Sequence, residues 1–141
     1  MITVTSVGGV VGQPFAEAYC AAKFAVEGWM ESLAPVIGKL GVDVSVIEPG
    51  AVATEFVANV RAGRDIEALI AEAGDYGPMM LNYIARTEES FRSAQTPPEV
   101  AAVVVAALTD DKPRFRYVTS EWADWFTGVK LADRTAPPYR R

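Results

Sequence analysis

The order of apolar and polar positions predicts that the chain begins with a strand, a long helix and a second strand. Alternating β-branched residues at 2–6, followed by glycines, indicate a short strand that ends in a loop. Between residues 17 and 40, apolar residues recur at intervals of three and four, the period of a helix with one buried face, and Gly41 ends the pattern. The stretch VDVSVIEPG at 42–50 predicts a second strand, near 43–48, which Pro-Gly terminates.

The remainder of the chain predicts a helical segment followed by one more helix and strand. Residues 51–95 are less regular and indicate three helices, the first of them capped by Thr54. A helix is expected from about 98 to 108 and a third strand near 115–119. This alternation favours a single α/β domain over residues 1–141, in which right-handed crossovers join three parallel strands.

Polar motifs follow the first two predicted strands. Ser6 ends the first strand, and Pro49-Gly50 ends the second. Because open parallel sheets bind ligands at the carboxyl ends of their strands, both motifs are expected at one edge. Tyr19 and Lys23, four residues apart, share a face of the predicted helix. On its own, that spacing is more often an ordinary amphipathic helix than a functional pair.

The composition excludes several classes of function. The chain has no histidine, which rules out Ser-His catalysis and zinc sites built on histidine, and the single Cys20 cannot form an internal disulfide. The net charge is −5, and the terminal pair Arg140-Arg141 is the only basic cluster, so no nucleic-acid partner is expected. No apolar run reaches the roughly 18 residues of a membrane span, and the start lacks the pattern of a signal peptide. These features predict a cytoplasmic protein with no metal site.

Three of these polar groups together suit the transfer of a proton at a carbonyl oxygen. A free phenol, with a pKa of about 10, is a poor base at neutral pH, but a nearby ammonium favours the phenolate. A serine hydroxyl can donate a hydrogen bond to the same oxygen and hold it in place. The matching reaction is the interconversion of an alcohol and a carbonyl, and its hydride must come from a cofactor because no side chain supplies one.

The arrangement of Ser6, twelve residues, Tyr19, three residues and Lys23 resembles the active-site signature of the short-chain dehydrogenase/reductase family. EPGAVATEF at 48–56 resembles the Pro-Gly-x-Val-x-Thr segment that lies beside the nicotinamide in that family. The stretches AVEGWMESLA and IEPGAVATEF are most similar to its steroid and retinol dehydrogenase branch. The resemblance covers the whole chain and is strongest over residues 2–57.

This resemblance implies a fold, a reaction and a cofactor. The fold would be the carboxyl-terminal half of a Rossmann-type doubly wound parallel sheet, α/β in class, with three strands and flanking helices. The reaction would interconvert an alcohol and a ketone or aldehyde with NAD or NADP, on a small retinoid- or steroid-like substrate. Residues 57–95 would form lid helices over the substrate. The helix at 17–40 would join copies of a homo-oligomer through Trp29, Leu33 and Val36, for which core packing is the alternative.

The resemblance also implies roles for single residues. Tyr19 would be the general acid/base, Lys23 would favour its phenolate and bind the nicotinamide ribose, and Ser6 would orient the substrate carbonyl. Further cofactor contacts would come from Pro49, Gly50, Val52 and Thr54, and substrate contacts from Ser6, Val7, Gly8, Gln13 and Pro14. Without the motif, Thr54 is equally well explained as a helix cap, and Pro49-Gly50 as a turn.

Several features of the family that precede the serine are not found. They are the glycine-rich dinucleotide fingerprint, the charged residue that selects NAD or NADP, and the catalytic asparagine. The sequence therefore predicts a truncated enzyme that lacks the fingerprint half, binds NAD(P) weakly, and exposes an unpaired edge at 2–6. The alternative is a non-catalytic remnant that acts as an oligomerisation or binding module.

Overall fold

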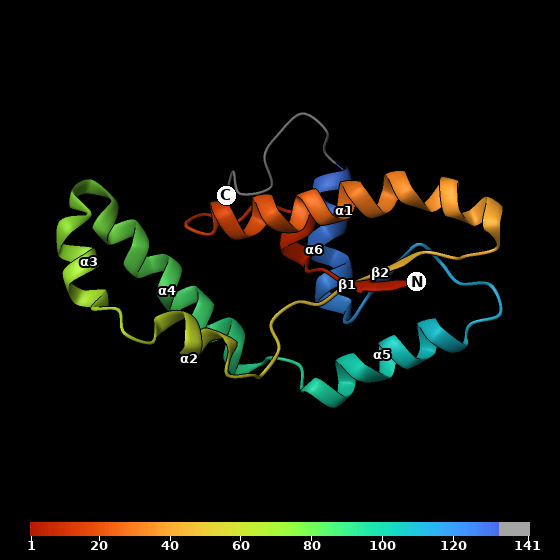
Figure 1. Cartoon of the computed structure of the whole chain (residues 1–141). Helices are drawn as coiled ribbons and strands as arrows, with labels where there is room; N and C mark the ends of the chain where they lie inside the picture. Colours follow the sequence, from red (N-terminus) through yellow and green to blue (C-terminus); the bar gives the residue numbers. More distant parts are fainter. Residues whose placement is uncertain (133–141) are drawn as a thin grey trace. The chain divides into compact units, whose positions relative to one another are not determined.

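The computed structural model describes residues 1–132, with the exception of four side chains inside helices, at 57, 60, 61 and 131. The described chain forms two compact units (Figure 1). The first joins Met1–Gly50 to the residues from Pro98 onward, and the second is Ala51–Pro97. Within residues 1–132, no helix is both long and apolar enough to cross a membrane.

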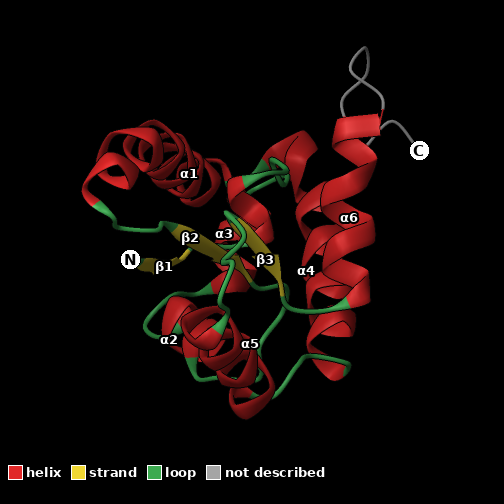
Figure 2. Cartoon of the chain, turned by 90° about the vertical axis from the view of Figure 1, so that its right-hand side faces the viewer, coloured by secondary structure: helices red, strands yellow, loops and turns green. Residues whose placement is uncertain are grey.

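A three-stranded parallel sheet forms the centre of the first unit. Strand β1 (Ile2–Val4) pairs with β2 (Ser45–Glu48), and β2 pairs with β3 (Arg116–Val118), both in parallel (Figure 2). The order β1-β2-β3 follows the sequence, as expected when each crossover helix returns the chain to the next position in the sheet. This confirms the predicted parallel sheet, with each strand shorter than its apolar run.

The central strand is covered on both faces. All four residues of β2 are buried, and Ile47 lies between Val4 of β1 and Tyr117 of β3 in the register. Because neighbouring side chains of a strand point to opposite faces, Val46 and Ile47 belong to different apolar clusters. One cluster contains Met30, Val44 and Val46, and the other contains Ile47, Ala107 and Tyr117.

Two helices supply these clusters, one on each face of the sheet. Helix α1 (Glu17–Ile37) brings Met30, which is fully buried, and continues into a 3₁₀ turn that ends at Gly41 with a φ of +77°. Helix α5 (Pro97–Thr109) brings Ala107 to the other face. Both helices match the predicted ones within one residue at each end, apart from the change to 3₁₀ geometry in the last turn of the first.

A third helix of this unit, α6 (Glu121–Ala132), was not predicted. It packs against β3 and against the loop that follows β1. Its apolar residues recur at helical spacing, at positions 122, 125, 126 and 129, so the sequence did carry a signal for this helix.

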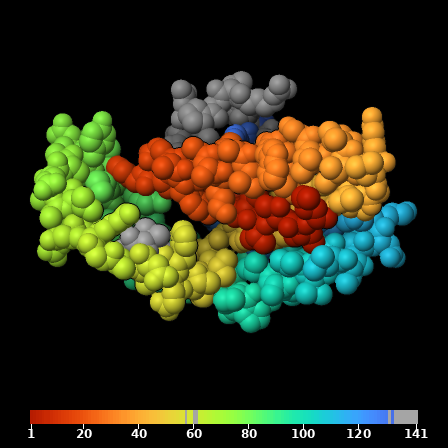
Figure 3. Space-filling view, viewed as in Figure 1, coloured from red at the N-terminus to blue at the C-terminus, as the bar shows by residue number. Residues whose placement is uncertain are grey.

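The first unit has an open sheet edge. Among the described strands, β1 pairs with β2 alone, and half of the surface of Met1 and Val4 is exposed. Figure 3 shows the N-terminal segment, in dark red, at the surface between α1 and α5. An unpaired edge of this kind is the feature that the sequence predicted for residues 2–6.

The second unit consists of helices. They are α2 (Phe56–Arg61), α3 (Ile66–Glu72) and α4 (Gly77–Arg92), with a 3₁₀ turn before α4. Gly77 permits the close contact between α3 and α4, since a Cβ there would lie 2.9 Å from the carbonyl oxygen of Ile70.

Backbone pairing closes the ends of this second unit. The amide of Ala53 donates to the carbonyl of Gln95 at 2.8 Å, and the amide of Gln95 donates to Ala51 at 3.0 Å. The predicted cap of its first helix is wrong by one residue. Glu55 occupies the N-cap without a side-chain hydrogen bond, whereas the Thr54 hydroxyl accepts a long 3.4 Å bond from the amide of Phe56.

Candidate active site

The loop after β1 carries Ser6 to the carboxyl edge of the sheet. The Val7 amide donates to the Pro49 carbonyl at 3.0 Å, so this loop and the end of β2 remain paired beyond the strands. Val7–Gly9 forms a 3₁₀ turn, and the Ser6 hydroxyl caps it by accepting the Gly8 amide at 3.0 Å. The two motifs that were expected at one edge of the sheet therefore lie side by side.

Gly9 allows this turn to rest directly on α1. A Cβ at Gly9 would lie 2.9 Å from Cγ of Glu27 and 3.2 Å from the carbonyl oxygen of Lys23. The 2.9 Å contact is closer than real Cβ atoms approach other atoms, so a larger residue would force the Glu27 side chain or the loop to shift. The glycine thus sets the distance between the serine loop and the helix that carries Lys23.

Three predicted site residues meet around Gly8. A Cβ built on Gly8 would lie 3.0 Å from Cε1 of Tyr19, and 3.4 Å from both the Ser6 hydroxyl and the side-chain amide nitrogen of Gln13. The serine, the phenol ring and the amide therefore surround one small volume, which only glycine leaves open. Ser6 is 8% exposed and Tyr19 38%, so the phenol is the more accessible of the two.

Lys23 lies beside Tyr19 on the same face of α1. Its ammonium nitrogen is 5.8 Å from the centroid of the Tyr19 ring, as the four-residue spacing predicted. Lys23 is half-buried, which limits the screening of its charge by water. The ammonium and the aromatic ring thus lie next to each other on one face of α1.

A tight turn leads into this helix. The Gln13 amide donates to the sulfur of buried Cys20 at 3.4 Å, which ties the turn to the first residues of α1. Phe15 adopts a φ of +58°, an uncommon value for a residue with a side chain, and its amide donates to the carboxylate of Glu17 at 3.0 Å. Local strain of this kind is common at functional sites.

Helix α6 also contacts the loop that follows β1. The ammonium of Lys130 donates a short hydrogen bond to the Val10 carbonyl and lies 4.3 Å from the centroid of the Phe24 ring on α1. Burial disfavours its charged form and lowers the pKa of Lys130. Nothing in the sequence singles out Lys130, because a lone lysine near the end of a chain carries no motif.

Trp122 of α6 gives Gly50 a packing role. A Cβ at Gly50 would lie 3.2 Å from the Trp122 indole, which stacks on the Phe126 ring with centroids 4.8 Å apart. The close approach of this aromatic ring therefore favours glycine at position 50.

The other predicted site residues occupy different environments. Val7 is buried at 4% exposure, and Pro14 is exposed. Val52 and Thr54 belong to the second unit, where Val52 forms a bridge with Gln95.

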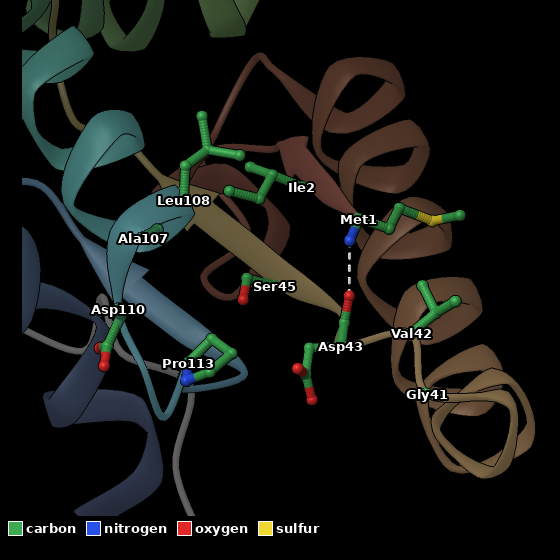
Figure 4. Close-up of a pocket in the computed structure, with 10 residues that line it drawn as sticks. All are labelled: Met1, Ile2, Gly41, Val42, Asp43, Ser45, Ala107, Leu108, Asp110 and Pro113. Atoms are coloured by element: carbon green, nitrogen blue, oxygen red, sulfur yellow. Dashed lines mark hydrogen bonds between the residues drawn. The ribbon is translucent and has the colours of Figure 1, made fainter.

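A pocket of about 310 Å³ opens at the opposite end of the sheet (Figure 4). Met1, Asp43, Ser45 and Pro113 line it near the amino ends of the three strands, together with Asp110. The terminal amine of Met1 donates to the Asp43 carbonyl across one side. Ligands of parallel sheets bind at the carboxyl ends, where Ser6 lies, so this pocket is separate from the candidate site.

Comparison with known proteins connects these residues to one family. A family model described as short chain dehydrogenase matches residues 1–65. The chain is 42% identical over 122 residues to human 17-beta-hydroxysteroid dehydrogenase type 1, covering 86% of this chain and 37% of that protein. It is 32% identical over 148 residues to bovine retinol dehydrogenase 8, covering 100% of this chain and 46% of that protein. The chain thus spans less than half the length of these curated relatives.

Solved structures show the same fold. A short chain dehydrogenase/reductase from Burkholderia phymatum in complex with NAD is similar with a TM-score of 0.71 and 23% identity, over 96% of this chain and 49% of that one. A short-chain dehydrogenase from Streptomyces avermitilis is similar with a TM-score of 0.68 and 24% identity, over 93% of this chain and 45% of that one.

Proposed function

Because the chain belongs to the short-chain dehydrogenase/reductase family, we propose that it carries the catalytic groups of an NAD(P)-dependent oxidoreductase. The reaction interconverts an alcohol and a ketone or aldehyde in the cytoplasm. One observation carries the proposal: the Ser6 hydroxyl and the Tyr19 ring meet around Gly8, and the Lys23 ammonium lies beside that ring. This combination can give a proton to a carbonyl oxygen in reduction and take it from the alcohol in oxidation.

Each of these three groups has a separate task. Tyr19 donates its proton to the oxygen in reduction and accepts it in oxidation. Lys23 stabilises the phenolate that remains. Ser6 donates a hydrogen bond to the same oxygen and fixes the substrate carbonyl beside Tyr19.

The donors at this edge fit a nicotinamide nucleotide. Tyr19 is partly exposed, and Lys23 lies on the same helix face, so a hydroxyl and an ammonium are presented together to ribose hydroxyls. When bound, the nicotinamide supplies or accepts the hydride. Further cofactor contacts, which the likeness to the family implies, are proposed for Pro49, Gly50, the Val52 backbone and the Thr54 hydroxyl.

The proposed substrate is a retinoid- or steroid-like alcohol or carbonyl, which is supported by the identity to relatives named for those activities. Gln13 is suited to bind it, since its amide faces the volume beside the phenol ring. Val7, Gly8 and Pro14 are proposed to complete the substrate side, as the likeness to the family implies.

A second function, assembly into a homo-oligomer, is favoured by the surface of α1. Trp29 is 64% exposed and Val36 62%, while Leu33 is half-buried. Exposed apolar side chains that gather on one helix commonly mark an interface. This assembly is compatible with catalysis and would also persist in a chain without activity.

The catalytic proposal is tested on the protein as its own gene expresses it, with residues 1–141 alone as a comparison. NADH and NADPH are titrated by energy transfer from tryptophan, and reduction of steroid and retinoid carbonyls is followed by loss of nicotinamide absorbance. Tyr19→Phe should lower turnover by about 10²–10⁴-fold, the usual contribution of a general acid, and leave cofactor binding intact.

Tyr76→Phe is the matched control, since Tyr76 is an exposed tyrosine of the second unit, and it should behave as the wild type. Equal turnover in both variants would show that another group supplies the proton. Absence of hydride transfer with either cofactor would reject the oxidoreductase function.

A further inference from the structure

An ionic cluster in the first unit joins two buried carboxylates to Arg116, whose own side chain is 42% exposed. Arg116 of β3 donates from Nε to the carboxylate of Glu48 at 3.0 Å, and from Nη2 to Glu27 at 3.3 Å and Glu31 at 3.4 Å. Glu48 is 1% exposed and Glu27 4%, whereas the Glu31 side chain is largely in solvent. Two carboxylates are therefore buried against a single guanidinium.

Glu27 joins this cluster to the catalytic helix and to the serine loop. It lies four residues after Lys23 on the same helix, and its carboxylate accepts the hydroxyl of Thr5, the residue before Ser6. Its Cγ is also the atom nearest to the position that a Cβ on Gly9 would occupy. Any movement of Glu27 would be transmitted to both sides of the contact between the loop and the helix.

Glu48 joins the cluster to the turn at the end of β2. It immediately precedes Pro49, whose carbonyl accepts the Val7 amide. The two buried carboxylates thus belong to the two segments that the serine loop contacts, α1 and the end of β2.

We propose that Arg116 is a positioning residue, which holds the Ser6 loop, α1 and the Pro49 turn in their mutual geometry through Glu27 and Glu48. The inference rests on the proposed function, because the geometry matters only if Ser6 and Tyr19 act on one oxygen. Without the guanidinium, two carboxylates would be buried close together with no opposite charge between them. Their repulsion is relieved when one of them moves or takes up a proton, and either change weakens a link to the segments that support Ser6.

The arrangement is not that of a cation site. Among residues 1–132, no three carboxylate, thiol or imidazole side chains are placed to hold a metal ion. The guanidinium fills the space between the carboxylates, and its three donor contacts account for its position.

The first test is hydrogen exchange of ¹⁵N-labelled residues 1–141, which requires no turnover. The reporters are the Gly9 amide, which donates to the Ser6 carbonyl at 2.8 Å, and the Gly8 amide. Arg116→Met should lower their protection by about tenfold, which corresponds to ~1.4 kcal/mol. Amides near Ala107 of α5, on the other face of the sheet, should keep their protection.

Arg116→Lys is the second variant, in case the first does not fold. It keeps the charge but lacks the planar fork that contacts several carboxylates at once, so it should reproduce part of the effect at Gly8 and Gly9. Arg114→Met is the matched control, since the Arg114 guanidinium lies over the Tyr117 ring, outside the cluster.

The second test uses the enzyme. Both Arg116 variants should lower kcat for carbonyl reduction and leave the KM for the reduced cofactor nearly unchanged. If Gly8 and Gly9 keep wild-type protection in Arg116→Met, or in Arg116→Lys should the first variant not fold, or if the amides of α5 are affected equally, the positioning role is overturned. If the exchange results are as expected but the wild type shows no hydride transfer, the proposed function is rejected while the positioning role of Arg116 stands.

Discussion

Glu48 gives the fold a pH dependence that can be measured. Burial, followed by the charge of Glu27, raises the pKa of Glu48 from 4.5 to about 7, although Arg116 opposes the change. The folded state therefore holds this proton more tightly than the unfolded state. Protonation of Glu48 therefore adds to the free energy of unfolding. This contribution is fully present below pH 4.5 and is lost as the pH rises through about 7.

The size of the effect follows from the same values. A pKa that rises from 4.5 to about 7 corresponds to about 3 kcal/mol between the two protonation states. Glu48→Gln keeps the size of the side chain and an oxygen for Arg116, but it has no proton to lose. Relative to the wild type, the free energy of unfolding of Glu48→Gln should therefore rise by about 3 kcal/mol between pH 4.5 and 8.

Urea unfolding followed by tryptophan fluorescence, at four pH values between 4.5 and 8, measures this difference. Glu31→Gln is the control, because Glu31 contacts the same arginine from an exposed position and its difference from the wild type should stay nearly constant. A constant difference for Glu48→Gln, or one that falls with rising pH, would refute the argument that Glu48 is protonated in the fold near neutral pH.

Three further predictions concern the serine loop, the bond from Lys130 to that loop, and the exposed surface of α1. Gly8→Ala should reduce turnover sharply in steady-state assays, since the added Cβ would press on the Tyr19 ring at 3.0 Å. Gly12→Ala is the control and should keep wild-type turnover, because a Cβ there would meet nothing within 4 Å. Lys130→Met should lower the free energy of unfolding, measured by urea titration, by about 1–2 kcal/mol, because a charge-assisted hydrogen bond to Val10 is lost. Lys112→Met is the control and should have little effect, because Lys112 is exposed. Trp29→Glu should shift sedimentation toward the monomer, and an unchanged oligomer would exclude that face as the interface.

The sequence by itself determined the three-stranded sheet of this protein and the two helices that cover its faces. Hydrophobic period and turn residues are local properties, so the three strands, α1 and α5 could be predicted close to their observed bounds. The relation between Tyr19 and Lys23 could be predicted for the same reason, because four residues of helix fix which side chains share a face. Parallel pairing then brought Ser6 and Pro49 to one edge.

Tertiary structure alone decided which polar groups are buried. Glu27 and Glu48 look like ordinary charged residues in the sequence, and the arginine that makes their burial tolerable lies 89 residues after Glu27 and 68 after Glu48. The packing of α6 on the serine loop, with Lys130 bonded to Val10 across 120 residues, is likewise without a local signal. The cost of removing a charge from water depends on the partners that the fold brings to it, and no pattern of neighbours along the chain contains that information.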